Sequence, residues 1–119
     1  MKKFLLLTLV MLLPMIALPV RSQNIVGIWK CISSVDIVEG QTIYDYMKGQ
    51  FLTVNADGTY ISTSEYMGNG IYAIQGNQFA AHNSKGFSFT ATYSVSGNKL
   101  TMEGGSSNDV YFSYIFERV

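Results

Sequence analysis

The chain contains Phe87-Ser88-Phe89-Thr90-Ala91-Thr92-Tyr93-Ser94-Val95-Ser96, a ten-residue run in which apolar and polar side chains alternate without an error. Successive side chains of a β-strand point to opposite faces, so a period of two places one face of this run in a core and the other in water. Three of the five apolar residues are aromatic. The run therefore predicts a half-buried strand with a strongly aromatic inner face.

Further β-rich runs lie on both sides of this strand and are separated by short turn signals. Asn55–Gly58, Gln75–Asn77 and Ser96–Asn98 are rich in residues that tolerate positive φ, which is typical of hairpin connections. The predicted strands are 25–34, 50–54, 59–66, 70–75, 78–82, 86–96, 99–103 and 110–118. An open meander of this kind would expose two edges, and closure into a barrel removes them. We expect an all-β, antiparallel, eight-stranded up-and-down barrel, with a two-sheet sandwich as the alternative.

Residues 35–49 form the one long connection, between the first two predicted strands. Thr42-Ile43-Tyr44-Asp45 resembles a helix capping box with Asp in place of Glu, and Tyr46 and Met47 follow Ile43 at helical spacing. The pattern predicts a short helical lid over one end of the barrel. A surface loop that packs its tyrosines is the alternative.

The N-terminal segment reads as a secretory signal peptide. Met1-Lys2-Lys3 is basic, residues 4–20 are almost entirely apolar, and Val20 and Ser22 stand where a signal peptidase reads. We expect cleavage after Ser22, which leaves a single domain, residues 23–119, that is periplasmic or secreted. An uncleaved membrane anchor is the alternative, although Pro14 interrupts the apolar run.

The composition of the remaining 97 residues limits the classes of protein to which the domain can belong. They carry five Lys and Arg against eight Asp and Glu, an acidic balance that argues against a nucleic-acid surface. They contain no second apolar run that could span a membrane, and their 15 aromatic residues can build a core. Cys31 is the only cysteine, so the domain has no internal disulfide, and its place inside the first strand argues against a lipoprotein.

Short motifs at the two ends of the domain resemble a known family. Gly27-Ile28-Trp29 opens the first strand and Arg118 closes the last, as in the lipocalin-like (calycin) barrels. Asn55–Tyr60 and Tyr93–Leu100 are similar to segments of small secreted lipocalin-like domains from bacteria. The resemblance implies that Gly27, Trp29 and Arg118 close one end of the barrel, with the arginine packed across the indole.

No motif indicates metal or catalytic chemistry. Asn55–Gly58 imitates half of a calcium loop, but Ser64 stands where a bidentate Glu is needed. His82 is the only histidine, without a partner for a metal site or a triad, and Cys31 is interpreted as a small buried hydrophobe. The sequence therefore predicts no metal, no cofactor and no enzyme.

The acidic residues of the long connection, Asp36, Glu39 and Asp45, are interpreted mainly as solubilising charges. Loops often carry function, so a role for these carboxylates stays open.

The aromatic inner faces are the feature of the sequence that indicates a function. An eight-stranded barrel is just wide enough to be filled by side chains or to hold one small ligand. We expect a small apolar or aromatic ligand to contact Tyr46, Phe87, Phe89, Tyr93, Phe112, Tyr114 and Phe116. The alternative is a filled core and a protein-interaction or inhibitory module that acts through exposed loops such as Gly104–Asp109.

Overall fold

The computed structural model describes residues 25–107 and 109–119. The predicted signal peptide, residues 1–22, and its cleavage site lie outside the described residues.

The described residues form nine β-strands and no helix. The strands are β1 (Gly27–Val38), β2 (Gln41–Tyr44), β3 (Phe51–Val54), β4 (Thr59–Ser62), β5 (Asn69–Gln75), β6 (Gln78–Asn83), β7 (Ser88–Ser96), β8 (Lys99–Ser106) and β9 (Val110–Arg118). The predicted strand at 59–66 ends early, at Ser62. The strand predicted to end at residue 103 continues to Ser106, so half of the expected loop at 104–109 belongs to β8.

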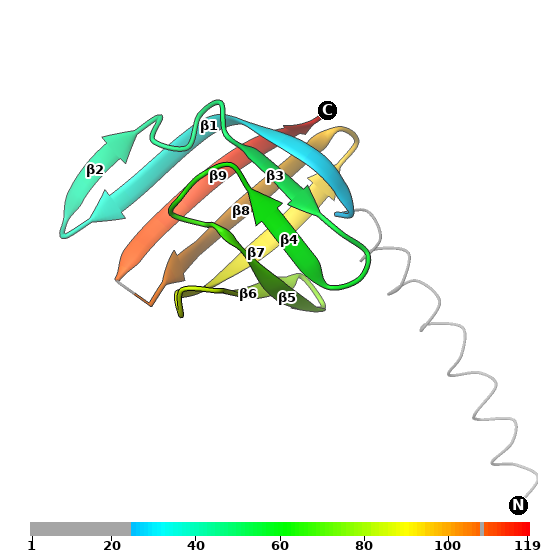
Figure 1. The fold of residues 1–119 in the computed structure, drawn as a ribbon. Helices are drawn as coiled ribbons and strands as arrows, with labels where there is room; N and C mark the ends of the chain where they lie inside the picture. The colour runs from blue at the N-terminus through cyan, green and yellow to red at the C-terminus, as the bar shows by residue number, and fades with distance from the viewer. Residues whose placement is uncertain (1–24, 108) are drawn as a thin grey trace, which may run out of the picture.

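Eight of these strands close into a barrel (Figure 1). From β3 to β9 each strand pairs antiparallel with the next, and β1 pairs with both β3 and β9. The seam between β1 and β9 runs from Trp29 opposite Arg118 to Val38 opposite Val110. The closed eight-stranded antiparallel barrel is thus confirmed, with β2 as an extra strand that pairs only with β1 in the described sheet.

The helical lid predicted for residues 35–49 is wrong. Val35–Val38 continues β1, and β2 folds back on it with Val38 opposite Gln41. The two residues of the turn, Glu39 and Gly40, have φ of 50° and 80°, the positive values that a tight hairpin turn requires. Pairing with β1 satisfies the backbone of this segment more completely than one helical turn would, because a short helix leaves most of its end groups unpaired.

Residues 45–50 follow the hairpin as an irregular segment that runs beside the middle of β1. Asp45 N donates to Ser34 O at 2.9 Å, Gly49 N donates to Cys31 O at 2.8 Å, and Cys31 N donates to Gln50 O at 2.8 Å. The segment therefore fills the gap along β1 between β2 and β3. It also buries Met47 completely.

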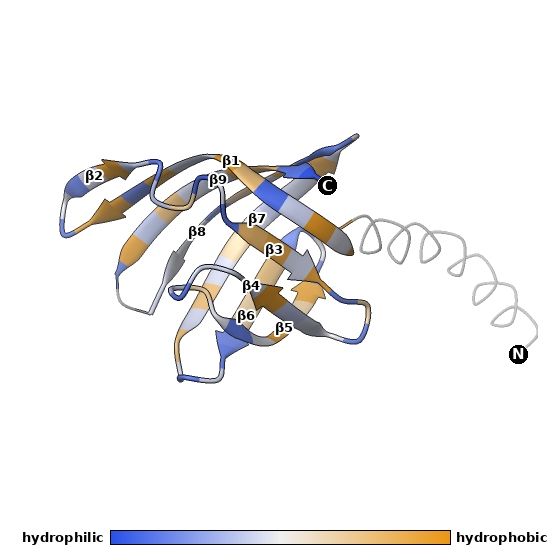
Figure 2. Ribbon diagram, turned by 45° about the horizontal axis from the view of Figure 1, so that its top comes forward, coloured by the Kyte–Doolittle hydropathy of each residue, from blue (hydrophilic) through white to orange (hydrophobic). Residues whose placement is uncertain are grey.

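Apolar and polar residues alternate along the strands (Figure 2), and the apolar residues form one core. In β7 the side chains of Phe89, Ala91 and Tyr93 are buried, while the threonines between them are exposed. Apolar residues from all eight barrel strands meet the same cluster. Burial of this surface is the main favourable term in folding, and no disulfide contributes because Cys31 is free.

The barrel has two different ends. The hairpins at 55–58, 76–77 and 97–98 gather at one end with Trp29 and Arg118, and we call this the closed end. The connections at 45–50, 63–68 and 84–87 gather at the other end with the β8–β9 connection, and we call this the mouth.

Candidate functional site

The closed end is plugged by an indole and a guanidinium. Trp29 is fully buried, and Cζ of Arg118 lies 4.2 Å from the centroid of its ring. Nε1 of Trp29 donates to Ile25 O at 2.8 Å, and Nη1 of Arg118 donates to Val26 O at 3.1 Å. Both polar groups are therefore satisfied by the segment that leads into β1, and the rings and stem of the pair exclude water from this end.

Gly27 makes room for this arrangement. A Cβ at this position would lie 2.6 Å from Nη1 of Arg118, closer than any van der Waals contact allows, and the residue has a φ of 147° that favours glycine. The Gly-x-Trp motif thus has a physical reason: the glycine gives the guanidinium access to the ring two residues later.

The interior between the two ends is lined by aromatic rings in an unbroken series of contacts. Five of the six predicted inner-face residues are buried inside the barrel, and the sixth, Phe87, is partly buried at the mouth and packs against the same core. Tyr46 lies at the mouth with 55% of its surface exposed. The ring-centroid distances are 6.2 Å for Tyr46–Tyr66, 4.8 Å for Tyr66–Phe87, 6.4 Å for Phe87–Phe89, 6.0 Å for Phe89–Phe112, 4.6 Å for Phe112–Tyr114 and 6.1 Å for Tyr114–Phe116.

Buried polar side chains gather at the mouth. Among the described residues they are Ser34, Asp36, Ser62, Ser64 and Asn83, and each stands at the mouth end of its strand or in the connection beyond it. Most of them hold the connections in place. Ser34 Oγ accepts from Met47 N at 2.9 Å, and Asn83 Oδ1 accepts from Phe87 N at 2.9 Å.

Asp36 is the exception in this group, because only half of its carboxylate is satisfied. The side chain is 2% exposed, and its Oδ2 accepts a hydrogen bond of 2.6 Å from the Tyr114 hydroxyl. Its Oδ1 is buried without a partner in the described residues. Burial raises the pKa of Asp36, an effect that the Tyr114 hydrogen bond opposes. Burial and the adjacent carboxyl also hold the pKa of Tyr114 far above its ordinary value, so its hydroxyl stays a donor.

Comparison with known proteins shows the family of this chain. A family model described as a lipocalin-like domain matches residues 25–117. The chain belongs to the lipocalin-like family. No curated protein matches it. A solved structure described as the de novo design of a fluorescence-activating beta barrel is similar at 15% identity over 82% of this chain and 95% of that chain, with a TM-score of 0.45.

Sequence reasoning misplaces two residues of this lipocalin-like barrel, Tyr66 and Asp36. The alternation pattern places Tyr66 in a strand, but it lies in the β4–β5 connection, where its hydroxyl donates to Ser106 Oγ at 3.1 Å. The interpretation of Asp36 as a solubilising charge is wrong, because the structure buries it. The signal available in the sequence is weak: Asp36 stands in a run of β-branched residues, where a buried carboxylate is unusual.

The other residues considered for chemistry have structural roles in the lipocalin-like barrel. Cys31 is buried, its thiol donates to Ser33 O at 3.4 Å, and burial raises its pKa to about 11, so it is not an activated thiolate. His82 Nδ1 lies 2.9 Å from Ser88 Oγ on an exposed surface. Asp57 accepts from the backbone and hydroxyl of Thr59 in the β3–β4 hairpin.

No group of three or more His, Cys, Asp or Glu that could hold a metal ion occurs within residues 25–107 and 109–119. In the same part of the chain, no helix has the length and hydropathy needed to cross a membrane.

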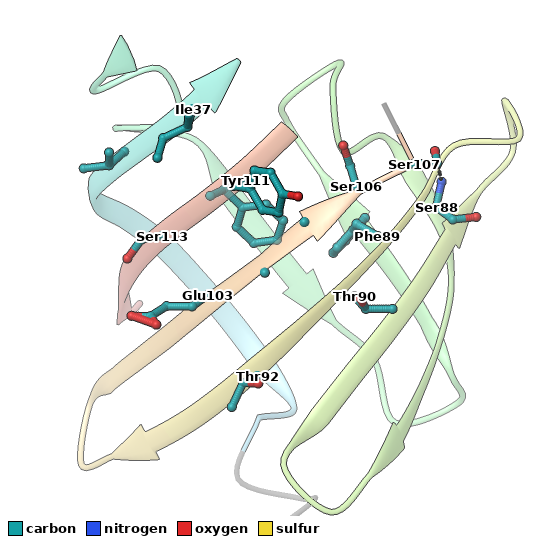
Figure 3. A pocket seen from close by; sticks show the side chains of 14 residues that line it. Ile37, Ser88, Phe89, Thr90, Thr92, Glu103, Ser106, Ser107, Tyr111 and Ser113 are labelled. Atoms are coloured by element: carbon teal, nitrogen blue, oxygen red, sulfur yellow. Dashed lines mark hydrogen bonds between the residues drawn. The ribbon is translucent and has the colours of Figure 1, made fainter. Parts of the chain in front are cut away.

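The outer face of the barrel carries an open hollow of about 930 Å³ across β1, β9, β8 and β7 (Figure 3). Its floor is thin because Gly104 and Gly105 have no side chains, and the ring of Tyr111 lies over Gly105. Glu103 and Thr92 border it on the side toward the closed end. The hollow is separate from the mouth, although Phe89 and Phe112 lie beneath it.

Proposed function

We propose that the protein is an exported, non-catalytic binding module that takes up a small apolar or aromatic molecule at the mouth of the barrel. The observation that carries this proposal is the series of ring contacts that begins at the exposed Tyr46 and continues through Tyr66 and Phe87 into the interior. The family assignment supports it, because the lipocalin-like fold is generally used for binding rather than catalysis.

The difference between the two ends of the barrel sets the direction of entry. The closed end is plugged by Trp29 and Arg118, and the backbone carbonyls beside them are already engaged. At the mouth, Tyr46 is more than half exposed and Tyr66 and Phe87 are only partly buried. Of the two ends of the barrel, the mouth is therefore the one at which a ligand meets exposed aromatic surface that continues into the interior.

The packed interior limits the size of the ligand. The rings of Phe89, Phe112 and Tyr114 already fill the barrel below the rim, as expected for eight strands. A single ring inserted among Tyr46, Tyr66 and Phe87 would extend the existing series. Each favourable ring pair contributes about 0.5–1.5 kcal/mol beyond the burial of its area.

Binding at the mouth can be tested with indole as the probe and NMR as the readout. We expect saturable shifts of the Tyr66 and Phe87 resonances. Tyr66→Ala should lower the affinity about fivefold or more, because the ligand loses the central ring of the Tyr46–Tyr66–Phe87 series that it would contact. Tyr44→Ala is the matched control, since Tyr44 is 70% exposed on β2. Shifts confined to the outer hollow, or equal loss in both variants, would refute a site at the mouth.

Export is a separate part of the proposal and has its own test. It rests on the basic start and the apolar run of residues 4–20. We expect the exported protein to begin at Gln23 in N-terminal sequencing. A protein that keeps Met1 and stays with the membrane fraction would contradict cleavage.

A protein partner is the second candidate function, because apolar residues cluster on the outer face. Ile37 pairs with Tyr111 across the β1–β9 seam, and Val35 pairs with Tyr44 across the β1–β2 hairpin. Tyr44 and Tyr111 are 70% and 61% exposed. A partner captured by cross-linking and released by Tyr111→Ser, with indole binding intact, would favour this function.

A further inference from the structure

We propose that the ligand bound at the mouth is an aromatic amine, or another compound with a cationic N–H group, whose charge is held by Asp36 Oδ1. This inference rests on the proposed function and names its ligand class. Its physical basis is the one carboxylate oxygen inside the barrel for which the described residues provide no donor.

The unsatisfied oxygen is unusual for a folded protein. An ionised carboxyl accepts hydrogen bonds at both oxygens, and a buried acceptor without a partner destabilises the fold. Most such groups in native structures are paired. Asp36 is 2% exposed and its Oδ2 already accepts a hydrogen bond from Tyr114, so the missing hydrogen bond is at Oδ1.

The elements packed around Asp36 do not supply the missing donor or a positive charge. Its register partners on β9 and β2 are Phe112 and Ile43, which have no polar side-chain atoms. The hydroxyl of Tyr66 is used by Ser106. Burial raises the pKa of Asp36 and the Tyr114 hydrogen bond lowers it, and no lysine, arginine or histidine of the described chain is among the groups that shift it.

The other titratable groups near Asp36 are neutral or negative. Burial, and to a smaller extent the Asp36 carboxylate, raises the pKa values of Tyr66, Tyr114 and Cys31, all of which keep their protons at neutral pH. The one charged group among these neighbours is Asp45, which acts on Cys31 from the segment beside β1. Lys48 and Lys85 stand in connections at the mouth, but neither is among the groups that act on Asp36. The field at Asp36 is therefore negative, and it favours a cation over an anion.

The walls near the carboxylate suit a cation that carries a ring. Phe112 stacks on Tyr114 at 4.6 Å and 21°, and Tyr66 contacts Phe87 at 4.8 Å. Ring faces attract ammonium groups, and the attraction grows when water is excluded. A carboxylate with aromatic walls therefore recognises both parts of an aromatic amine, which neither feature does alone.

Three probes with the same ring separate the contributions of charge and ring: tryptamine, 3-methylindole and indole-3-propionate. Isothermal titration of the protein at pH 7 should show tryptamine bound about tenfold or more tightly than 3-methylindole, with indole-3-propionate weakest, because charge-assisted hydrogen bonds are the stronger class. Asp36→Asn should remove the preference for tryptamine while leaving 3-methylindole affinity within about twofold. Glu117→Gln is the matched control, because Glu117 is an exposed carboxylate near the closed end whose loss should leave the preference unchanged.

The possible outcomes distinguish failure of the amine assignment from failure of the aromatic binding site. Equal binding of tryptamine and 3-methylindole would overturn the amine assignment and leave the aromatic site in place. An unchanged preference in Asp36→Asn would show that water satisfies Oδ1, and would also overturn it. Failure of all three probes to bind would overturn both proposals. If Asp36→Asn does not fold, the carboxyl ¹³C resonance of Asp36 in the unaltered protein gives the test: it must move with tryptamine and not with 3-methylindole.

Discussion

Replacement of Gly27 by alanine should destabilise the barrel far more than the loss of one glycine ordinarily does. The new Cβ would lie 2.6 Å from Nη1 of Arg118, and we expect the guanidinium to move away from Trp29 to make room. The displacement removes a cation–π contact, about 0.5–2 kcal/mol, and a charged hydrogen bond to Val26 O, about 1.5–3 kcal/mol. Alanine at a φ of 147° adds about 1–3 kcal/mol of backbone strain.

Arg118 is partly exposed, so the lower ends of these ranges apply, and we expect a total loss of about 3–4 kcal/mol. For a domain of this size such a loss lowers Tm by on the order of 15 °C. The assay is urea unfolding followed by fluorescence, because Trp29 is the only tryptophan and reports directly on the closed end.

The control variant is Gly76→Ala. Gly76 has a φ of 63° and nothing within 4 Å of an added Cβ, so alanine there carries left-handed strain of about 1–2 kcal/mol and no steric clash. Adding Gly27→Ala to an Arg118→Ala background completes a double-mutant cycle, in which the Gly27→Ala penalty should fall to the strain alone. The explanation fails if Gly27→Ala costs no more than Gly76→Ala, or if its penalty is the same without Arg118.

Three further outcomes follow from buried groups. Asp36→Asn should gain stability relative to the unaltered protein as pH rises from about 4 to 7, measured by urea unfolding. The folded-state pKa of Asp36 is raised, so its contribution to the stability of the unaltered protein is present below the unfolded pKa and is lost as pH rises through the folded pKa. Tyr114 and Cys31 titrate far above this pH range. A stability difference that does not change with pH would contradict the burial of the charge. Met47→Ala should lower the free energy of unfolding by about 2–5 kcal/mol, because the Met47 side chain is fully buried where residues 45–50 pack on the core. A loss below about 1 kcal/mol would show that this segment does not pack there. Gly104→Ala should abolish protection of β7–β8 amides in hydrogen exchange, because a Cβ would overlap a β7 backbone oxygen. Unchanged protection would mean that the β7–β8 pairing accommodates the Cβ, which would contradict the overlap.

The barrel was predictable because its strands carry the two strongest signals available to a reader of sequence. Period-two alternation in Phe89–Ser96 identified a strand and its inner face, and the hairpin residues at Asn55–Gly58 fixed the connection before β4. Closure was expected because an open meander would expose two edges. The resemblance of Gly-x-Trp and Arg118 to the ends of lipocalin-like barrels implied that the first and last strands meet, as they do.

Asp36 was missed because the first strand was predicted to end at residue 34, which placed Asp36 in the connection. A longer predicted strand would still have misplaced it, because β1 is irregular. Counting alternate residues from Trp29 puts Val35 and Ile37 inside and Asp36 outside. The register shifts between Cys31 and Ser33, and this bulge exchanges the two faces of the strand beyond it. Ile37 is consequently exposed and Asp36 buried. Nothing in the local sequence marks the bulge, because it depends on how β9 aligns with both halves of β1.

The β1–β2 hairpin was missed for a different reason. Thr42–Asp45 fits a helix start, and the window is too short for periodicity to separate one helical turn from a four-residue strand. Glu39-Gly40 carried the competing turn signal. The hairpin prevails because β1 is long enough to offer it an edge that β3 does not cover.

The pairing of the first barrel strand with the last has a kinetic consequence. The β1–β9 seam joins residues from opposite ends of the domain, so it forms only after the intervening chain has been brought into a closed loop, at a cost in chain entropy that no local contact offsets. Such long-range pairing slows folding, and domains dominated by it fold in milliseconds to seconds. Until the seam forms, β1 presents an unpaired edge that other chains can join. Refolding yield should therefore fall as protein concentration rises, because association of these transient edges competes with ring closure.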